Sequence, residues 1–366
     1  MKPDIIRPAK LYMLRELKSQ LQRVMRATGL NQGLSASEWR RGKLLILCYH
    51  GISQDDEHEW NPGLFMSPTT FERRLEILNE GGYRVLALSE AVDRLAKSSL
   101  PHKSVVLTFD DGMANFRTVA LPILRKYGYP ATVYLRTDYC YYQRPVFHPV
   151  CPYLLWKQRH SIVPANSKLG WLEPQDLRTR EGRARAWSSI QRIGGTGQLS
   201  DEDRDVVLME LARNIGIDYE SFLESRILQI MNPAEVSAIA EEGVDIQLHT
   251  HRHRLITTLD QDHELRTEIE ENRTRILQLT GRNPVHFCYP VGRYSPDYLP
   301  ALRQLGIATA TTCEPDLADK NSDPLLLPRY VDTEVKTQES FEAWLSGVGS
   351  LLVRFRANRN RHSNQG

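Results

Sequence analysis

The stretch that decides the fold is Val105–Gly112, which reads VVLTFDDG. Its apolar first half is typical of a strand buried on both faces of a parallel sheet. Its second half places two carboxylates and a glycine at the end of that strand, where ligands collect in α/β sheets. Adjacent side chains leave an extended backbone in different directions, so Asp110 and Asp111 are expected to have different roles. An ordinary turn between a strand and a helix is the alternative, because Asp and Gly favour turns.

A second stretch, Ile246–His253, is an apolar strand that ends in three histidines at alternate positions. If the chain turns as it leaves the strand, His249 and His253 can converge on one ion. His251 and Arg252 are the members most readily assigned to a structural role. Carboxylate and imidazole are the ligand pair of hydrolytic metal sites. A purely structural cluster is the alternative, but three of the chain's 11 histidines lie within the five positions 249–253.

Together these stretches resemble the motifs of the polysaccharide deacetylase (NodB-homology) family of carbohydrate esterases. Thr108–Gly112 matches the family's Thr-Phe-Asp-Asp-Gly motif at every position, and His249–His253 matches its His-Ser/Thr-x-x-His motif. Phe287–Tyr294 is similar to a third motif, a Pro-aromatic-Gly loop. The resemblance covers roughly residues 44–331, with a long interruption. The first two motifs in this order are specific, whereas the third alone is weak.

The resemblance implies a metal-dependent hydrolysis. Asp111, His249 and His253 would hold a divalent metal, with Zn²⁺ preferred and Co²⁺ or Mn²⁺ as alternatives. Asp110 would be the general base that takes a proton from the attacking water. The metal would polarise the acetyl carbonyl and lower the pKa of that water.

The third motif would bind the substrate or the oxyanion through Tyr289, Pro290, Val291 and Gly292. A backbone N–H near Val291 would contribute to the oxyanion hole, where one donor stabilises the transition state by about 3 kcal/mol. The usual form of this motif begins with an arginine that steadies the catalytic aspartate. Cys288 stands at about that place here, and Arg329 is the candidate for the missing positive charge.

The general acid also departs from the common pattern, because the late Leu-x-x-His motif is absent. No histidine lies between His286 and His362. His50 follows the apolar run Leu44–Cys48 and resembles the acid of the poly-N-acetylglucosamine deacetylase subgroup. A protonated histidine can donate to a leaving amine at neutral pH. A histidine that merely caps the strand end is the alternative.

Composition indicates a globular enzyme. The 366 residues are 25% charged with a net charge of +2, and no basic stripe suggests a nucleic acid partner. Five scattered cysteines predict free thiols in a reducing compartment, and therefore a cytoplasmic location. No signal-peptide core and no run of 18 apolar residues is found. Residues 10–28 predict a basic amphipathic helix, which either docks on protein or contacts anionic lipid at the membrane surface.

Alternating strand and helix patterns predict an α/β fold, a distorted or incomplete (β/α) barrel with a helical insertion over the strand ends. Helices are expected over 71–79, 115–127, 233–242, 265–280 and 299–305, and further strands over 83–86, 131–135 and 308–312. The glycine-rich run Gly194-Gly195-Thr196-Gly197 predicts a linker within the insertion. We divide the chain into an N-terminal amphipathic helix and linker (1–40), the barrel (41–137 and 232–345), the helical insertion or cap (138–231), and a helix end with a polar, disordered tail (346–366).

The function that these features favour is hydrolytic N-deacetylation of an acetamido sugar in a polysaccharide, oligosaccharide or lipid-linked glycan. The expected partner is thus an acetylated glycan or glycolipid. Two alternatives remain: an O-acetyl esterase or non-sugar amidohydrolase on the same fold, and a carbohydrate-binding protein that has lost catalysis. The intact set of Asp110, Asp111, His249 and His253 argues against the second.

Overall fold

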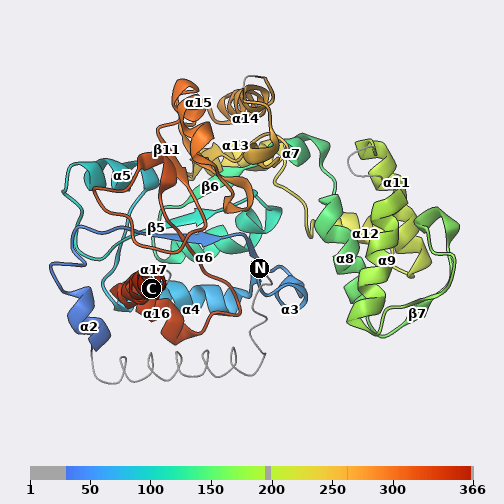
Figure 1. Ribbon diagram of the computed structural model, residues 1–366. Coiled ribbons are helices and arrows are strands. Elements are labelled where there is room, and N and C mark those ends of the chain that lie inside the picture. Colours follow the sequence, from blue (N-terminus) through green and yellow to red (C-terminus); the bar gives the residue numbers. More distant parts are fainter. Residues whose placement is uncertain (1–29, 194–198, 262, 364–366) are drawn as a thin grey trace.

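The central feature of the fold is a parallel sheet, seen in the computed structural model in Figure 1, which describes residues 30–193, 199–261 and 263–363. Helices surround this sheet. Its strands are β1 (Leu45–Tyr49), β4 (Arg84–Val85), β5 (Ser104–Phe109), β6 (Thr132–Leu135), β9 (Asp245–Leu248), β10 (His286–Cys288), β11 (Thr309–Thr311) and β12 (Tyr330–Val331). Their order is β11-β10-β9-β6-β5-β1-β12, and β4 pairs with the start of β5.

The sheet curves into an incomplete barrel. Its outermost strands, β11 and β12, approach each other through a parallel bridge between Thr311 and Leu327. Two main-chain hydrogen bonds of 2.9 Å support that bridge, from Thr312 N–H to the Leu327 carbonyl and from Leu327 N–H to the Ala310 carbonyl. The prediction of a distorted or incomplete (β/α) barrel is confirmed.

The apolar runs form the inner strands as expected. Every residue of β1 and β5 is buried, and the two strands pair in register from Leu45 with Val105 to Tyr49 with Phe109. The two hydroxyls in β5 are both satisfied: Ser104 donates to the Pro101 carbonyl at 2.7 Å and Thr108 to the Leu47 carbonyl at 2.8 Å, so burial does not leave these polar groups unpaired. This pairing fixes the ends of both strands at the same edge of the sheet.

The barrel helices fall close to the predicted ranges. Figure 1 shows α14 and α15 on one side of the sheet, and α4 and α16 on the other. Ser67 caps the N-terminus of α4 by accepting from Thr70 N–H, and Gly281, with φ 66°, ends α14. The helices are α2 (Leu30–Ser35), α3 (Glu57–Trp60), α4 (Pro68–Glu80), α5 (Leu88–Ala96), η1 (Phe116–Ala120), α6 (Leu121–Lys126), α13 (Pro233–Glu241), α14 (Glu264–Thr280), α15 (Leu299–Gln304), α16 (Gln338–Ser346) and α17 (Val348–Ser363), with the 3₁₀ turns η3 (Ile256–Thr258), η4 (Pro290–Gly292), η5 (Pro296–Tyr298) and η6 (Pro324–Leu326).

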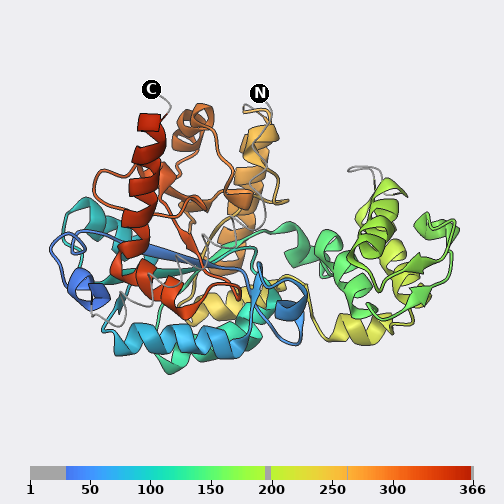
Figure 2. The same ribbon diagram turned by 60° about the horizontal axis from the view of Figure 1, so that its bottom comes forward.

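The insertion forms a helical lobe that stands to one side of the barrel in both Figure 1 and Figure 2. Buried Trp171 donates its ring N–H to the Ala186 carbonyl over 3.1 Å inside the lobe. An ion pair of 2.7 Å from Lys157 to Asp56 ties the lobe to the barrel. The lobe therefore contacts the barrel beside the sheet. Its elements are α7 (Asp138–Tyr142), α8 (Phe147–Lys157), β7 (Ile162–Val163), η2 (Ser167–Leu169), β8 (Gln175–Asp176), α9 (Arg180–Ile193), α11 (Asp201–Asn214) and α12 (Tyr219–Glu224).

Near the C-terminus, the prediction of a disordered polar tail is wrong, because α17 continues to Ser363. An ion pair of 3.1 Å between Arg354 and Asp316 joins this helix to the barrel. Arg and Ala are good helix formers, so the polar composition does not oppose a helix here. The helix predicted at residues 10–28 and the linker predicted at 194–197 lie outside the described residues.

Within the described ranges, no helix has both the length and the apolar character needed to cross a membrane.

Candidate active site

The candidate site lies at the edge of the sheet where the carboxyl ends of β1, β5 and β9 are found, with β6 between β5 and β9. His50 directly follows β1, Asp110 and Asp111 follow β5, and His249 follows β9. Since these strands are parallel, their ends share one edge of the barrel. All four side chains, together with His253, line a cavity of about 960 Å³. The structure thus brings together residues that lie up to 203 positions apart in the chain.

Asp111, His249 and His253 form a compact group. The Oδ1 atom of Asp111 lies 3.5 Å from Nε2 of His249 and 3.3 Å from Nε2 of His253. The three candidate ligand atoms all lie within 4.8 Å of one another. Asp111 and His253 both have left-handed backbone conformations, with φ of 68° and 55°. Such conformations are costly for non-glycine residues and cluster at functional sites, where the surrounding structure enforces them.

The ring of His249 is held in one orientation by groups from three other elements. Its backbone N–H donates to the side-chain oxygen of Asn272 over 2.9 Å, and Asn272 in turn donates to the Leu135 carbonyl. The Nδ1 atom of His249 lies 2.9 Å from the Cys288 carbonyl, an acceptor that requires Nδ1 to carry the hydrogen. Nε2 of His249 therefore faces Asp111 and is the ring nitrogen that would bind a metal.

The charges of this group also suit a divalent cation. Burial opposes ionisation of Asp111, but the nearby imidazoles of His253 and His249 outweigh it and hold the pKa of Asp111 well below its usual range. Burial lowers the pKa of His253 to about 4, although the Asp111 carboxylate opposes this change. A carboxylate and a neutral imidazole are the forms that bind metal. The residues present therefore fit a metal with three protein ligands.

Asp110 is engaged by a buried arginine instead. The Nη1 and Nη2 atoms of Arg329 each donate a hydrogen bond to one carboxylate oxygen of Asp110, and both hydrogen bonds are 2.7 Å long. Arg329 is anchored by a third hydrogen bond, from Nε to the Thr312 carbonyl over 2.9 Å. Burial opposes ionisation of Asp110, but the guanidinium outweighs it and holds the pKa of Asp110 well below its usual range. Arg329 thus occupies the role that Cys288, at the usual arginine position, cannot fill.

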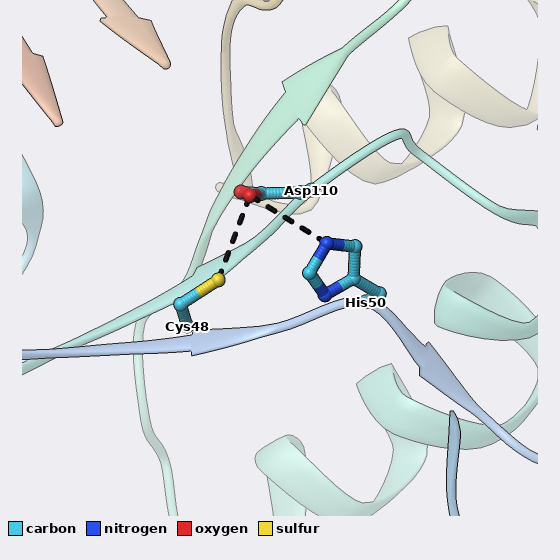
Figure 3. A group of neighbouring side chains, drawn as sticks. All are labelled: Cys48, His50 and Asp110. Atoms are coloured by element: carbon cyan, nitrogen blue, oxygen red, sulfur yellow. Dashed lines mark hydrogen bonds and ion pairs between the residues drawn. The ribbon is translucent and has the colours of Figure 1, made fainter. Parts of the chain in front are cut away.

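His50 lines the cavity, and Figure 3 shows its ring and the Cys48 thiol both directed toward the carboxylate of Asp110. Its Nε2 atom is 3.9 Å from Oδ2 of Asp110, and 21% of its side chain is exposed. The Cys48 thiol lies 3.5 Å from the same carboxylate oxygen, from the buried side. His50 can therefore reach both Asp110 and a molecule in the cavity.

Two further groups in the described part of the chain have metal-ligand spacing: Cys48 with His50 and Asp110, and Asp110 with His249 and Cys288. Both depend on Asp110, whose two oxygens already accept from Arg329. The Asp111 group lacks such a competing cation among its ligand contacts. The geometry therefore favours the Asp111 group over these two as the place for a metal.

The predicted substrate loop is only partly at the cavity. Val291 lines it, has a left-handed φ of 58°, and is highly exposed. As the second residue of the one-turn helix η4, it has an N–H without a partner inside that helix. Tyr289 and Pro290 are buried, and the Tyr289 hydroxyl donates to the Leu325 carbonyl over 2.8 Å. Gly292 packs against Cys313, so only Val291 of the four meets the cavity.

His251 turns away from Asp111, in keeping with the structural role expected for it, and its Nδ1 atom is 2.9 Å from the Thr137 hydroxyl. Other residues around the site were not anticipated from the sequence. Arg136 lines the cavity and is paired with Asp138 over 2.7 Å. The sequence did contain a signal for Asn272, because this polar residue lies on the same buried face of helix α14 as Ile269 and Ile276. The lobe residues that line the cavity carry no recognisable motif: Tyr139, Val146, His148, Pro149, Leu199, Ser200, Asp201 and Arg204.

Comparisons with a family model and with curated proteins both point to polysaccharide deacetylases. The family model described as Polysaccharide deacetylase matches residues 97–161 and 209–310. YxkH of Bacillus subtilis (strain 168) is 36% identical over 94 residues, which are 25% of this chain and 32% of that protein. The poly-beta-1,6-N-acetyl-D-glucosamine N-deacetylase of Escherichia coli (strain K12) is 32% identical over 101 residues, which are 27% of this chain and 14% of that protein. The chain thus matches a third or less of the length of these two relatives.

A solved structure extends the likeness to most of the chain. The Streptococcus pyogenes deacetylase PplD in complex with acetate aligns with 83% of this chain and 98% of its own, with a TM-score of 0.54 and 21% sequence identity. At that identity the likeness concerns the fold. The parallel half-barrel with surrounding helices is the deacetylase fold.

Proposed function

Because this chain belongs to the polysaccharide deacetylase family, we propose that it is a metal-dependent N-deacetylase acting on an acetamido sugar of a polysaccharide, oligosaccharide or lipid-linked glycan. The observation that carries the proposal is that the two adjacent aspartates have different partners. Asp111 faces two imidazole nitrogens at 3.3 and 3.5 Å, while Asp110 is held by Arg329. A binding protein without catalysis would need only one of these arrangements.

Asp111, His249 and His253 would hold the metal, for which we propose Zn²⁺, with Co²⁺ or Mn²⁺ as alternatives. When bound, the metal supplies Lewis-acid polarisation of the acetyl carbonyl and increases the acidity of water. Three protein ligands leave coordination positions open, which is the pattern of catalytic sites. The hydrogen bond from His249 to the Cys288 carbonyl orients one ligand before metal binds.

Asp110 is the proposed general base. Water attacks the acetyl carbonyl while Asp110 takes its proton, the bond from carbonyl carbon to sugar nitrogen breaks, and acetate and a free amine result. Arg329 keeps Asp110 ionised, since the guanidinium holds the pKa of that carboxyl low. Arg329 also fixes the direction of both carboxylate oxygens through its two 2.7 Å hydrogen bonds. It is a positioning residue, because it lies buried behind Asp110 and does not reach the cavity.

His50 is the proposed general acid for the leaving nitrogen. It lines the cavity and lies close to Asp110, so a substrate amide can contact both. The N–H of Val291 is the proposed oxyanion donor, because it belongs to a left-handed turn at the cavity wall. An amide leaves poorly unless its nitrogen is protonated, whereas an ester needs less help. The presence of His50 therefore favours an amide over an ester substrate.

The size of the cavity supports a glycan substrate. Its walls extend from His253 to lobe residues such as His148 and Arg204. We propose that sugars next to the acetamido sugar contact the lobe. Lipid linkage of the glycan, contact of residues 10–28 with a membrane surface, and a cytoplasmic location remain predictions from the sequence.

The test compares acetate release from N-acetylated chito-oligomers and from O-acetylated xylan, using protein loaded with Zn²⁺. We expect release from the N-acetylated substrate, accompanied by new amine groups, and none from the Asp110→Asn variant. Release from xylan alone would identify an O-acetyl esterase. No release from a broad panel of acetylated glycans, by protein with full metal content, would contradict the proposed activity.

A further inference from the structure

Three of the five cysteines meet at the pair of Asp110 and Arg329. Cys48 comes from β1, Cys288 from β10, and Cys313 from the segment two residues after β11. The thiols of Cys48 and Cys288 lie 3.5 and 3.4 Å from Oδ2 of Asp110. These three thiols therefore surround the one ion pair on which the proposed base depends.

The Nη2 atom of Arg329 contacts two of the three thiols, those of Cys288 and Cys313. It lies 3.0 Å from the sulfur of Cys288 and 3.6 Å from that of Cys313. The Cys48 thiol, 3.5 Å from Oδ2 of Asp110, and the Cys313 thiol, 3.6 Å from Nη2 of Arg329, flank the same 2.7 Å hydrogen bond between those two groups. Neither thiol is part of a disulfide.

Only one of the three thiols is accessible from solvent. Cys313 lines the cavity beside His50, whereas Cys48 and Cys288 are fully buried. A small reagent that enters the cavity can thus reach Cys313 first. Cys48, buried against the same ion pair, is the candidate for a second thiol that reacts with an oxidised Cys313.

The surroundings of Cys313 favour its reactive form. The hydrogen bond with Cys48 and the positive charge of Arg329 lower the pKa of the Cys313 thiol to about 6, although burial opposes this change. Cys48 is the opposite case, because the same hydrogen bond and burial raise its pKa well above the usual value. Thiolates are the nucleophilic form of cysteine, and accessible thiolates next to a second thiol are the pattern of oxidation-sensitive sites.

We propose that Cys313 is a site of oxidation by peroxides and that Cys48 converts the product to a disulfide. The Cys313 thiolate attacks a peroxide oxygen, the O–O bond breaks, and after proton transfer water and a sulfenic acid result. The Cys48 thiol then attacks the Cys313 sulfur, the S–O bond breaks, and a second water leaves as the disulfide forms. Two electrons pass from the thiol pair to the peroxide.

The modification would disturb the site from two directions. On one side, a Cβ placed at Gly292 would lie 2.6 Å from the Cys313 Cβ, so the Val291 loop and Cys313 have no spare space between them. On the other side, both sulfurs contact the ion pair of Asp110 and Arg329. Formation of the disulfide is independent of the proposed function. The expected loss of deacetylation rests on that function.

The experiment treats zinc-loaded, full-length protein with hydrogen peroxide and maps its cysteines by mass spectrometry. We expect the chain to become about 2 Da lighter through a Cys48–Cys313 disulfide, and a dithiol to reverse the change. The Cys48→Ser variant should instead accumulate a sulfenic acid at Cys313, trapped by dimedone. The matched control is Cys140→Ser, because Cys140 is a buried thiol in the lobe, and this variant should form the disulfide as the wild type does.

The result that would overturn the proposal is an unmodified Cys313 in the wild-type protein, since that measurement needs no substitution and no activity. A disulfide between Cys313 and Cys288 would refute Cys48 as the second thiol. Acetate release is measured on the same samples, each relative to its own untreated protein. Full activity of the oxidised protein would refute the effect on catalysis, while absence of activity before oxidation would count against the proposed function alone.

Discussion

Arg329 donates two hydrogen bonds of 2.7 Å to Asp110, one to each carboxylate oxygen, and both side chains are almost completely excluded from solvent. The two residues lie 219 positions apart: Asp110 directly follows β5 and Arg329 directly precedes β12, and these strands lie on either side of β1. A paired, planar guanidinium fixes both the charge and the orientation of a carboxylate. The charge that steadies the proposed base thus comes from the residue before the last strand of the barrel, and not from the third motif.

The first prediction removes this arginine. Arg329→Gln should leave Asp110 as a buried carboxylate without its cation, which costs about 3–5 kcal/mol of stability. Deacetylation should fall much further than the loss of folded protein explains, because the base is no longer oriented. The matched control is Arg74→Gln, which breaks the buried ion pair with Asp332 (3.0 Å). Equal activity per folded molecule in both variants, measured alongside chemical unfolding, would contradict the positioning role.

The second prediction concerns metal content. His253→Ala should lower metal affinity by at least about 10–100-fold, the loss that follows when even an outer-shell partner is removed. His251→Ala provides the control, because its ring faces Thr137 and not Asp111. Elemental analysis of both purified variants checks the prediction. A His251 variant that loses metal as readily as the His253 variant would show that the ligand assignment is wrong.

The third prediction separates the paired aspartates. Asp110→Asn should keep its metal and lose about 10²- to 10⁴-fold in turnover, as removal of a general base does. Asp111→Asn should lose metal, because the carboxylate that faces both imidazoles is gone. Metal titration and acetate release on the same preparations give both readings. The division of roles fails if the two variants retain metal and activity to the same extent.

The fourth prediction concerns the proposed acid. His50→Ala should depress hydrolysis of an N-acetyl sugar far more than that of an activated acetyl ester, whose leaving group needs no proton. A histidine acts as an acid only when it is protonated, so the fall in rate at high pH should disappear in the variant. Metal content should stay near normal, since His50 is not in the Asp111 group. Equal losses on amide and ester would instead assign His50 to substrate positioning.

The fifth prediction follows from the lowered pKa of Cys313. Because the thiolate is the reactive form, alkylation of Cys313 by iodoacetamide should rise with pH, reach half its maximum near pH 6, and level off above that. An ordinary thiol would reach half its maximal labelling rate at about pH 8.5. Cys140, whose pKa burial raises to about 12, should remain unlabelled throughout and serves as the internal control. Peptide mapping after brief labelling at each pH gives the rate for each cysteine, and a midpoint for Cys313 near that of a free thiol would refute the prediction.

Much of the site could be predicted from the sequence because strand ends are encoded locally. The apolar runs before His50, Asp110 and His249 identify buried parallel strands, and the ends of such strands lie at one edge. Helix ends were also local, as at Gly281, where a left-handed residue stops α14. The tail prediction failed for the opposite reason, since polar residues do not by themselves oppose a helix that packs on the barrel.

The direction of a side chain that leaves a strand end depended on tertiary structure. His253 faces Asp111 and His251 does not, because the left-handed backbone at Thr250 and His253 turns the chain between them, and nothing in those residue types requires that conformation. Tyr289 was expected at the substrate, but its hydroxyl reaches the Leu325 carbonyl inside the protein.

The sequence alone thus determined the barrel class, the strand ends and the residue types that meet there. The tertiary structure alone decided that Arg329 pairs with Asp110, that Cys48 and Cys313 both lie against this pair, and that the lobe forms one wall of the cavity. Local patterns follow from short-range backbone preferences and the burial of apolar faces. Contacts across 200 residues depend on how far the sheet curves, which is the sum of packing over all its strands.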